Sequence, residues 1–308
     1  MSGFLYSDDN KRYHTLHYYS KHHGGKCYKA VIDAGFTCPN IDGTKGVGGC
    51  TYCDGGSGYF TNSCTVPIEE QLKREISRIR EKHQDVGIIA YFQAHSNTYA
   101  SLDLLKRTFS KALENPDVCG ISIATRADCL DEDKVKYLKE LSEKTNLTVE
   151  LGLQTVSDET AEQINRGHSF DEFLQGYNLL KKYNIRTCVH IINGLPNEDY
   201  NMMINTAKVV GKLSPGGVKI HLLHIIKGTK MAREFENGEI KVMSRDDYVK
   251  TVVEQLRYLP PQTVIERITG DGDKSKLIAP LWSRDKIAVL GAIDKYMADN
   301  DIYQGDKI

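Results

Sequence analysis

The sequence has no run of about 20 consecutive apolar residues, which is the length that a membrane-spanning helix needs. Its first residues, MSGFLYSDDNKRYH, also lack the apolar core of a secretory signal peptide. We therefore expect a cytoplasmic protein that has no membrane partner. Extensive disorder is not expected either, because 40% hydrophobic residues supply enough apolar side chains for a sizeable core.

The sequence also lacks a net charge of any size, because 40 basic and 41 acidic residues leave a formal charge of -1. Such a balance gives no global electrostatic signature of nucleic-acid binding. One stretch differs, because no acidic residue occurs between Lys11 and Ile32. Its cations are Lys11, Arg12, Lys21, Lys26 and Lys29. We interpret residues 1–27 as a basic, aromatic arm that either binds RNA phosphates or is a solvated extension.

Internal repeats, low-complexity tracts and linkers are absent too, so we expect one continuous domain. Short apolar runs rich in β-branched residues alternate with amphipathic segments, which is typical of an α/β fold with a parallel sheet. The predicted strands are 28–34, 87–92, 120–125, 148–153, 186–192 and 218–224. Residues 157–184 have room for two helices, and the tail predicts a helix over 245–258, a strand over 263–267 and a last helix beginning at Ser283. A doubly wound sheet and a barrel both fit, and both place the active site at the carboxyl ends of the strands.

Cysteine is not scarce: eight residues are more than packing requires, and in a reducing compartment they indicate metal binding or catalysis. A glycine-rich loop after the first predicted strand carries Cys38, then eleven residues, Cys50, two residues and Cys53. Thiolates suit an iron–sulfur cluster, and three of them leave one iron open to a small molecule. The alternative is a structural zinc site with Cys64 as the fourth ligand. The other cysteines fit the role of small buried side chains.

The fourth predicted strand has one polar face. Glu150, Gly152 and Gln154 project to one side of it, while the residues between them are apolar. A polar face inside a sheet needs a partner, which is either a ligand or a buried hydrogen-bond network.

These features resemble the radical S-adenosylmethionine superfamily, in the variant with a widened first cysteine gap that the Elongator catalytic subunit also shows. The resemblance runs from about residue 12 to residue 231 through RYHTL, the cysteine loop, ATRADCL, ELGLQT, NRGHS, NGLPNED and KIHLLHIIKGT. It implies a partial (β/α)6 TIM-type barrel over 28–231, an N-terminal arm over 1–27 and a C-terminal helical extension over 232–308 packed on the barrel. It also implies a 4Fe-4S cluster on Cys38, Cys50 and Cys53 that reductively cleaves S-adenosylmethionine to a 5'-deoxyadenosyl radical.

The same resemblance implies residues that bind the cofactor. Arg166 would bind the methionyl carboxylate bidentately, and Tyr52 would lie beside the adenine. The full set of implied contacts is Tyr52, Gln93, Thr125, Arg126, Glu150, Gln154, Arg166, Ile192 and Asn193.

Within the superfamily, the motifs resemble a bacterial subfamily that acts on the wobble uridine of tRNA and converts 5-carboxymethylaminomethyl-uridine to 5-aminomethyl-uridine. The implied partners are tRNA and an electron donor such as flavodoxin or ferredoxin. One departure is Tyr59, where many relatives carry an acidic residue. Two alternatives stay open: a radical enzyme that acts on a small molecule such as a tetrapyrrole, and a zinc-stapled RNA-binding protein without enzymatic activity.

Four more side chains near the predicted strand ends are candidates for the substrate side of the site: His190, His221, His224 and Lys227. Ideal alternation along a strand puts His221 and His224 on opposite faces, which argues against one chelating pair. No catalytic acid or base can be assigned from the sequence.

Overall fold

The computed structural model describes residues 4–6, 10–54, 64–270 and 272–308. Tyr59, the departure noted above, lies outside the described residues. None of the helices in the described ranges is both long enough and apolar enough to cross a membrane.

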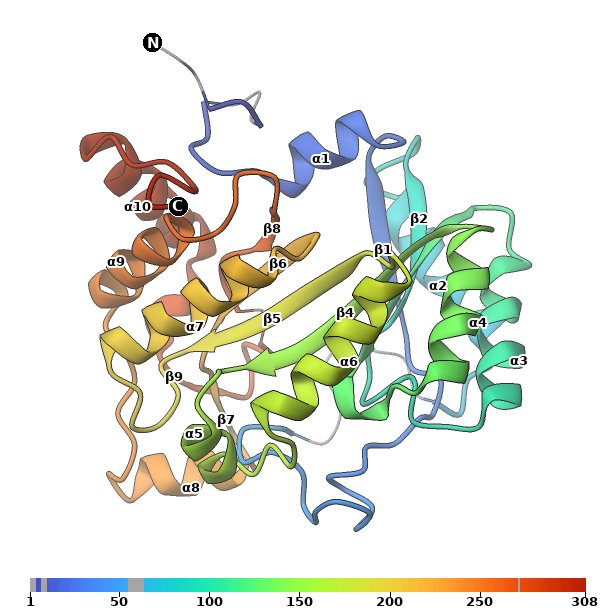
Figure 1. Cartoon of the computed structure of the whole chain (residues 1–308), viewed down its shortest axis with the longest axis horizontal. Coiled ribbons are helices and arrows are strands. Elements are labelled where there is room, and N and C mark those ends of the chain that lie inside the picture. The colour runs from blue at the N-terminus through green and yellow to red at the C-terminus, as the bar shows by residue number, and fades with distance from the viewer. Residues whose placement is uncertain (1–3, 7–9, 55–63, 271) are drawn as a thin grey trace.

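The core of the fold is a parallel sheet of seven strands in the order β1-β2-β3-β4-β5-β6-β8. Its strands are β1 (Cys27–Ile32), β2 (Gly87–Phe92), β3 (Val118–Thr125), β4 (Asn146–Gln154), β5 (Thr187–Asn193), β6 (Gly217–Leu222) and β8 (Val264–Arg267). The strand order follows the chain without a reversal, which excludes a doubly wound sheet and gives a curled half-barrel (Figure 1). The expected partial barrel is therefore confirmed, with β8 as a seventh strand after the six of the motif region.

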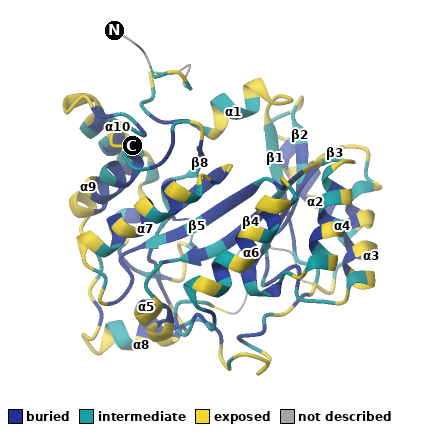
Figure 2. Cartoon of the chain, viewed as in Figure 1, coloured by how far each residue is buried: buried dark blue, intermediate teal, exposed yellow. Residues whose placement is uncertain are grey.

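Helices cover the outside of this sheet, and Figure 2 shows their exposed outer faces over buried strands. The crossover helices are α2 (Ile68–Arg80), α3 (Leu102–Leu113), α4 (Glu132–Ser142), α5 (Asp158–Gln163), α6 (Phe170–Lys182) and α7 (Tyr200–Leu213). The remaining elements are α1 (Leu16–His22), η1 (Ala127–Cys129), β7 (Ile225–Ile226), α8 (Lys230–Glu236), α9 (Arg245–Leu256), β9 (Leu277–Ala279), η2 (Leu281–Arg284) and α10 (Lys286–Asp299). The stretch 157–184 holds two helices, as predicted.

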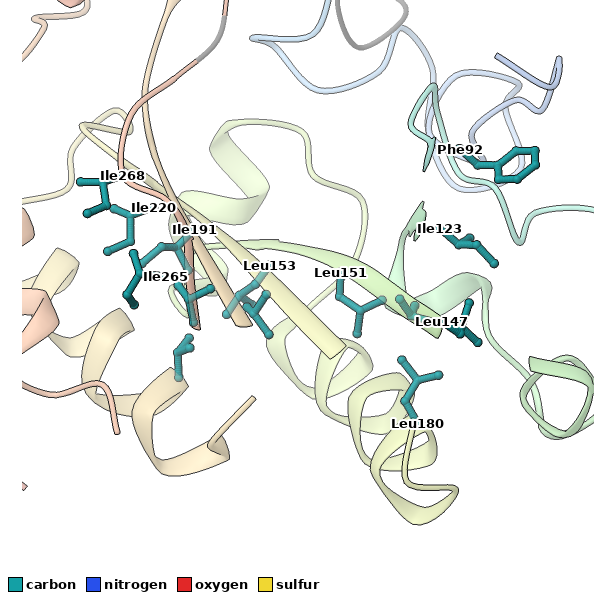
Figure 3. Packing of buried hydrophobic residues seen from close by; sticks show 14 of the residues in the cluster. Phe92, Ile123, Leu147, Leu151, Leu153, Leu180, Ile191, Ile220, Ile265 and Ile268 are labelled. Atoms are coloured by element: carbon teal, nitrogen blue, oxygen red, sulfur yellow. The ribbon is translucent and has the colours of Figure 1, made fainter. Parts of the chain in front are cut away.

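The main hydrophobic core lies between the sheet and these helices. Leu151 and Leu153 of β4 and Leu180 of α6 belong to one buried cluster (Figure 3). Burying each such side chain stabilises the fold by about 1.5–3 kcal/mol. Because these apolar residues point outward to the helices, the alternating residues of the same strand must face the inside of the barrel.

The last helix begins at Lys286, three residues later than the sequence predicts. Ser283 lies in the short helix η2, and Asp285 caps α10 by accepting a hydrogen bond from the Ala288 amide at 3.0 Å. Aspartate and serine are comparable caps, so local sequence alone does not choose between them.

Candidate functional site

One cavity of about 370 Å³ opens at the carboxyl ends of the strands. Cys38, Cys50 and Cys53 line one side of it, and Glu150 and Gln154 of β4 lie along its wall. The predicted polar face of β4 is therefore an inward face, as the alternation required. Most of the remaining sequence candidates also line the cavity, namely Tyr52, Gln93, Thr125, Arg126, Arg166, Ile192, His190, His221 and His224.

Two candidates lie elsewhere. Asn193 is buried against α9, where its side-chain amide exchanges two hydrogen bonds of 2.8 Å with Gln255. Lys227 is exposed and does not line the cavity. The structure does not bring either residue to the three cysteines, because Asn193 falls on the helix-facing side of β5 and Lys227 lies past the end of β7.

The cysteine loop is held in place by the NRGHS segment. The buried Asn40 donates to the Asn165 carbonyl and lies 3.8 Å from the Cys50 sulfur, while Asn165 donates to the Gly49 carbonyl at 2.8 Å. The Thr51 amide donates to the Ile164 carbonyl at 3.0 Å. At Gly46, a Cβ atom would come within 2.2 Å of the Asn40 side chain, so only glycine lets the loop approach so closely. These contacts keep the three sulfurs on one side of the cavity.

Arg126 and Arg166 have different roles in this arrangement. The guanidinium of Arg126 donates to both carboxylate oxygens of Asp128 at 2.9 and 2.8 Å, and to the carbonyls of Arg166 and Gly167. Arg126 therefore holds the NRGHS segment in place through hydrogen bonds to two of its carbonyls. Arg166 donates to the Gly152 carbonyl at 2.6 Å, and its buried Nε has no hydrogen-bond partner among the described residues.

These observations fit a cluster with bound S-adenosylmethionine. In such a cluster each thiolate binds a separate iron, and the three cysteine side chains border one cavity. The unsatisfied Nε of Arg166 is a donor that a carboxylate in the cavity would satisfy. Tyr52 lines the same cavity, and burial and then the neighbouring Cys50 raise its pKa well above the usual value.

Glu150 is the centre of a buried network that the sequence could not specify. Its carboxylate accepts from Ser122 at 2.7 Å, Tyr91 at 2.8 Å and His190 at 2.9 Å. It also forms ion pairs with Lys29 and Lys219, each at 2.5 Å. Burial alone would raise the pKa of Glu150, but the charges of Lys219 and Lys29 hold it well below the usual value. Both oxygens are therefore occupied by protein donors.

His221 and His224 differ from the expectation of opposite faces, because both line the cavity. The strand β6 ends at Leu222, so strict alternation no longer applies at position 224. Lys219 is a cavity residue that the sequence argument missed. The signal was present, because Lys219 and His221 are two apart on a predicted strand and share a face.

Three of the five cations in the acid-free N-terminal stretch pair with acidic residues in the folded protein. Lys11 pairs with Asp294, and Arg12 pairs with Asp301 at 2.7 Å. Lys29 lies inside the barrel beside Glu150. The acids that neutralise these cations are more than a hundred residues away in the sequence, where a scan of local charge does not find them.

Comparison with known proteins agrees with this geometry. The family described as Radical SAM superfamily matches residues 43–210, and the Radical_SAM C-terminal domain matches residues 215–299. The chain is 50% identical over 304 residues to the protein YtqA of Bacillus subtilis (strain 168), covering 98% of this chain and 94% of that protein. It is 26% identical over 290 residues to human Elongator complex protein 3, covering 79% of this chain and 51% of that protein.

A solved structure shows the same fold. The archaeal Elp3 of Methanocaldococcus infernus superposes with a TM-score of 0.65 at 17% identity, covering 90% of this chain and 64% of that one.

Proposed function

We propose that this chain, which belongs to the radical SAM superfamily, modifies the side chain of the tRNA wobble uridine by converting 5-carboxymethylaminomethyl-uridine to 5-aminomethyl-uridine. Members of the superfamily bind a 4Fe-4S cluster and S-adenosylmethionine, and these are the cofactors of this enzyme. When bound and reduced, they supply a radical that abstracts hydrogen from unactivated carbon. Family membership removes the alternative of a non-enzymatic zinc protein.

The cavity has a cofactor side and a substrate side, and different residues of the chain line each of them. Cys38, Cys50 and Cys53 would hold the cluster, and Arg166 would bind the methionyl carboxylate through its unsatisfied Nε. Gln154 and Tyr52 would complete this cofactor side. The histidines of β5 and β6 then face the space left for a substrate. The fold positions the reacting groups and excludes water, while the cofactor supplies the chemistry.

The observation that carries the proposal is the Elongator-like pattern of the chain: the wide cysteine gap, and homology to Elongator complex protein 3 over 79% of this chain. The reaction itself is inferred from the resemblance of the motif set to the wobble-uridine subfamily. A partner must supply electrons to the cluster, and we propose a flavodoxin or ferredoxin for that role.

The test is the nucleoside profile of tRNA from cells that lack this protein. We expect 5-carboxymethylaminomethyl-uridine to accumulate and 5-aminomethyl-uridine with its derivatives to disappear. A plasmid with wild-type protein or Cys64→Ala should restore the profile, whereas Cys50→Ala should not, because Cys50 is a proposed cluster ligand and Cys64 is not. An unchanged tRNA profile in the deletion strain would favour a small-molecule substrate such as a tetrapyrrole.

A further inference from the structure

The wall of the cavity formed by β5, β6 and β8 is rich in nitrogen donors. His190, Lys219 and Arg267 occupy paired positions on these three adjacent strands, and all three side chains line the cavity. His221 lies on the same inward face as Lys219, two residues further along β6, and its ring centre is 5.2 Å from that of His190. One cluster of basic side chains thus faces the part of the cavity that the cysteines leave open.

The acidic residues near this wall are already engaged. Glu150 accepts from five protein donors, as described above. Asp54 lies 3.7 Å from Lys276, and Asp273 accepts from the Ser275 amide and hydroxyl at 2.9 and 2.6 Å. These carboxylates therefore have partners of their own, and the wall still presents histidine nitrogens to the cavity.

Two histidine nitrogens in the cavity indicate that a ligand binds there. The Nε2 atoms of His221 and His224 are buried and have no hydrogen-bond partner within the described part of the chain. The backbone is shaped around His224, because a Cβ atom on Gly270 or Gly272 would come within 2.6 or 2.7 Å of its ring. Buried polar atoms in native proteins are normally paired, so a bound group that satisfies them is expected.

Lys219 and Arg267 bring positive charges to this wall, and Glu150 compensates that of Lys219. Burial lowers the pKa of His221 well below its usual value, and His190, Arg267 and Lys219 lower it further. Burial and then Lys219 lower the pKa of His190 to about 4. An anion bound beside these groups would offset the same positive charges.

We propose that His221, Lys219 and Arg267 form a subsite that binds a carboxylate group of the substrate. The identification of that group as the carboxylate at the end of the 5-carboxymethylaminomethyl substituent rests on the proposed function. Anchoring the charged end of a flexible substituent fixes its C–H bonds relative to the cofactor side of the cavity. The subsite would also reject a uridine whose substituent has lost the carboxylate, which separates substrate from product.

The experiment compares two anticodon stem-loop RNAs that differ only at the wobble substituent. One carries 5-carboxymethylaminomethyl-uridine, and the other carries its uncharged carboxamide. Because both have the same phosphates, any difference in affinity reports the carboxylate. Binding to the holoenzyme without reductant should be about tenfold or more tighter for the acid, as is typical of hydrogen bonds to a charged group. Equal affinities would overturn the subsite.

Variants locate the effect. Arg267→Gln and His221→Asn should each lower the affinity for the acid more than the affinity for the carboxamide, and so reduce the preference for the acid. Lys241→Gln is the matched control, because it removes an exposed positive charge that does not line the cavity. If Arg267→Gln does not fold, the proposal is still tested by His221→Asn and by the comparison of the two RNAs on the wild-type protein. A preference that survives in both wall variants would also overturn the proposal.

Measuring conversion of the RNA in the presence of reductant distinguishes a failure of the carboxylate subsite from a failure of the proposed reaction. Conversion of the acid RNA together with equal binding of acid and carboxamide contradicts the subsite alone. A clear preference for the acid without any conversion contradicts the proposed reaction and leaves the carboxylate subsite standing.

Discussion

At the scale of single residues, the carboxylate of Glu150 fixes the positions of several side chains inside the barrel. Glu150 carries the negative charge that compensates Lys29 and Lys219, and it fixes the orientations of Tyr91 and His190. Sequence alternation places Glu150 inside the barrel, but its five partners come from other strands. Glu150, which the resemblance implies as a cofactor contact, has both carboxylate oxygens bonded to protein donors and positions the side chains of this cavity wall.

Replacing this carboxylate should be costly. Glu150→Gln leaves the buried Lys219 ammonium without its counter-charge, while Lys29 keeps only its longer contact of 3.5 Å with Glu266, and we expect the change to lower the free energy of unfolding by about 3 kcal/mol. Glu234→Gln is the control, because its pair with the exposed Lys230 is a contact of 3.5 Å between neighbouring turns of α8 that contributes about 0.5 kcal/mol or less. Urea unfolding of the cluster-free protein measures both. Equal losses for the two variants would show that the buried network does not stabilise the fold.

A second residue links stability to pH. Burial raises the pKa of Glu198 to about 7, although Thr155 donates a hydrogen bond to it. As the pH rises from the usual glutamate pKa to about 7, the unfolded chain loses this proton while the folded chain keeps it, so the contribution of Glu198 to stability falls. Glu198→Gln should therefore lose less stability than wild type between about pH 5 and about pH 8.

The exposed Glu239→Gln serves as the control and should follow wild type across the same range. Urea unfolding at a series of pH values gives the comparison. If Glu198→Gln and wild type have parallel profiles, Glu198 has an ordinary pKa in the folded protein.

At the scale of elements, close packing of α6 fixes the segment that holds Arg166. Ser169 caps this helix in a reciprocal capping box with Glu172, directly after the NRGHS motif. Further along the helix, Gly176 lies against the backbone of η1. The helix therefore connects the position of Arg126, which precedes η1, to that of Arg166.

A methyl group at position 176 tests this contact. A Cβ atom there would lie 2.3 Å from the Ala127 carbonyl oxygen, and Gly176→Ala should destabilise the protein by roughly 2–3 kcal/mol. Gly291→Ala in α10 is the matched change, because no atom lies within 4 Å of the new methyl group. It should stabilise the protein by about 0.5–1 kcal/mol, since alanine suits a helix better than glycine. Chemical unfolding of both variants decides whether the two changes have opposite signs.

At the scale of the whole molecule, the two ends of the described chain lie together. Gln304 is buried, and its side chain donates to the carbonyls of Pro260 and Thr263 and accepts from the His14 amide at 2.8 Å. The Ile265 amide of β8 donates to the His14 carbonyl at 2.8 Å. The N-terminal arm and the C-terminal tail therefore stabilise the edge strand of the barrel jointly.

Removing the Gln304 side chain should loosen this junction. Gln304→Ala removes the partner of the His14 amide and one hydrogen bond from each of the Pro260 and Thr263 carbonyls, which costs about 1–3 kcal/mol. Hydrogen exchange at the His14 amide should become faster in this variant, while exchange in the central strands should change much less. Asn300→Ala is the control, because Asn300 is exposed and its side chain donates to the Tyr296 carbonyl within its own helix end. Unchanged exchange at His14 would contradict a shared junction.

The sequence by itself determined the α/β class, the inward face of β4 and the loop that carries Cys38, Cys50 and Cys53. These follow from short-range periodicity and spacing, which are properties of neighbouring residues. Tertiary structure decided which charges meet. Lys29 and Lys219 both pair with Glu150, and Arg12 pairs with Asp301. Asn193 faces away from the cavity, whereas His221 and His224 both line it. Electrostatic partners depend on distance in space, and a curled parallel sheet brings together side chains that are far apart along the chain.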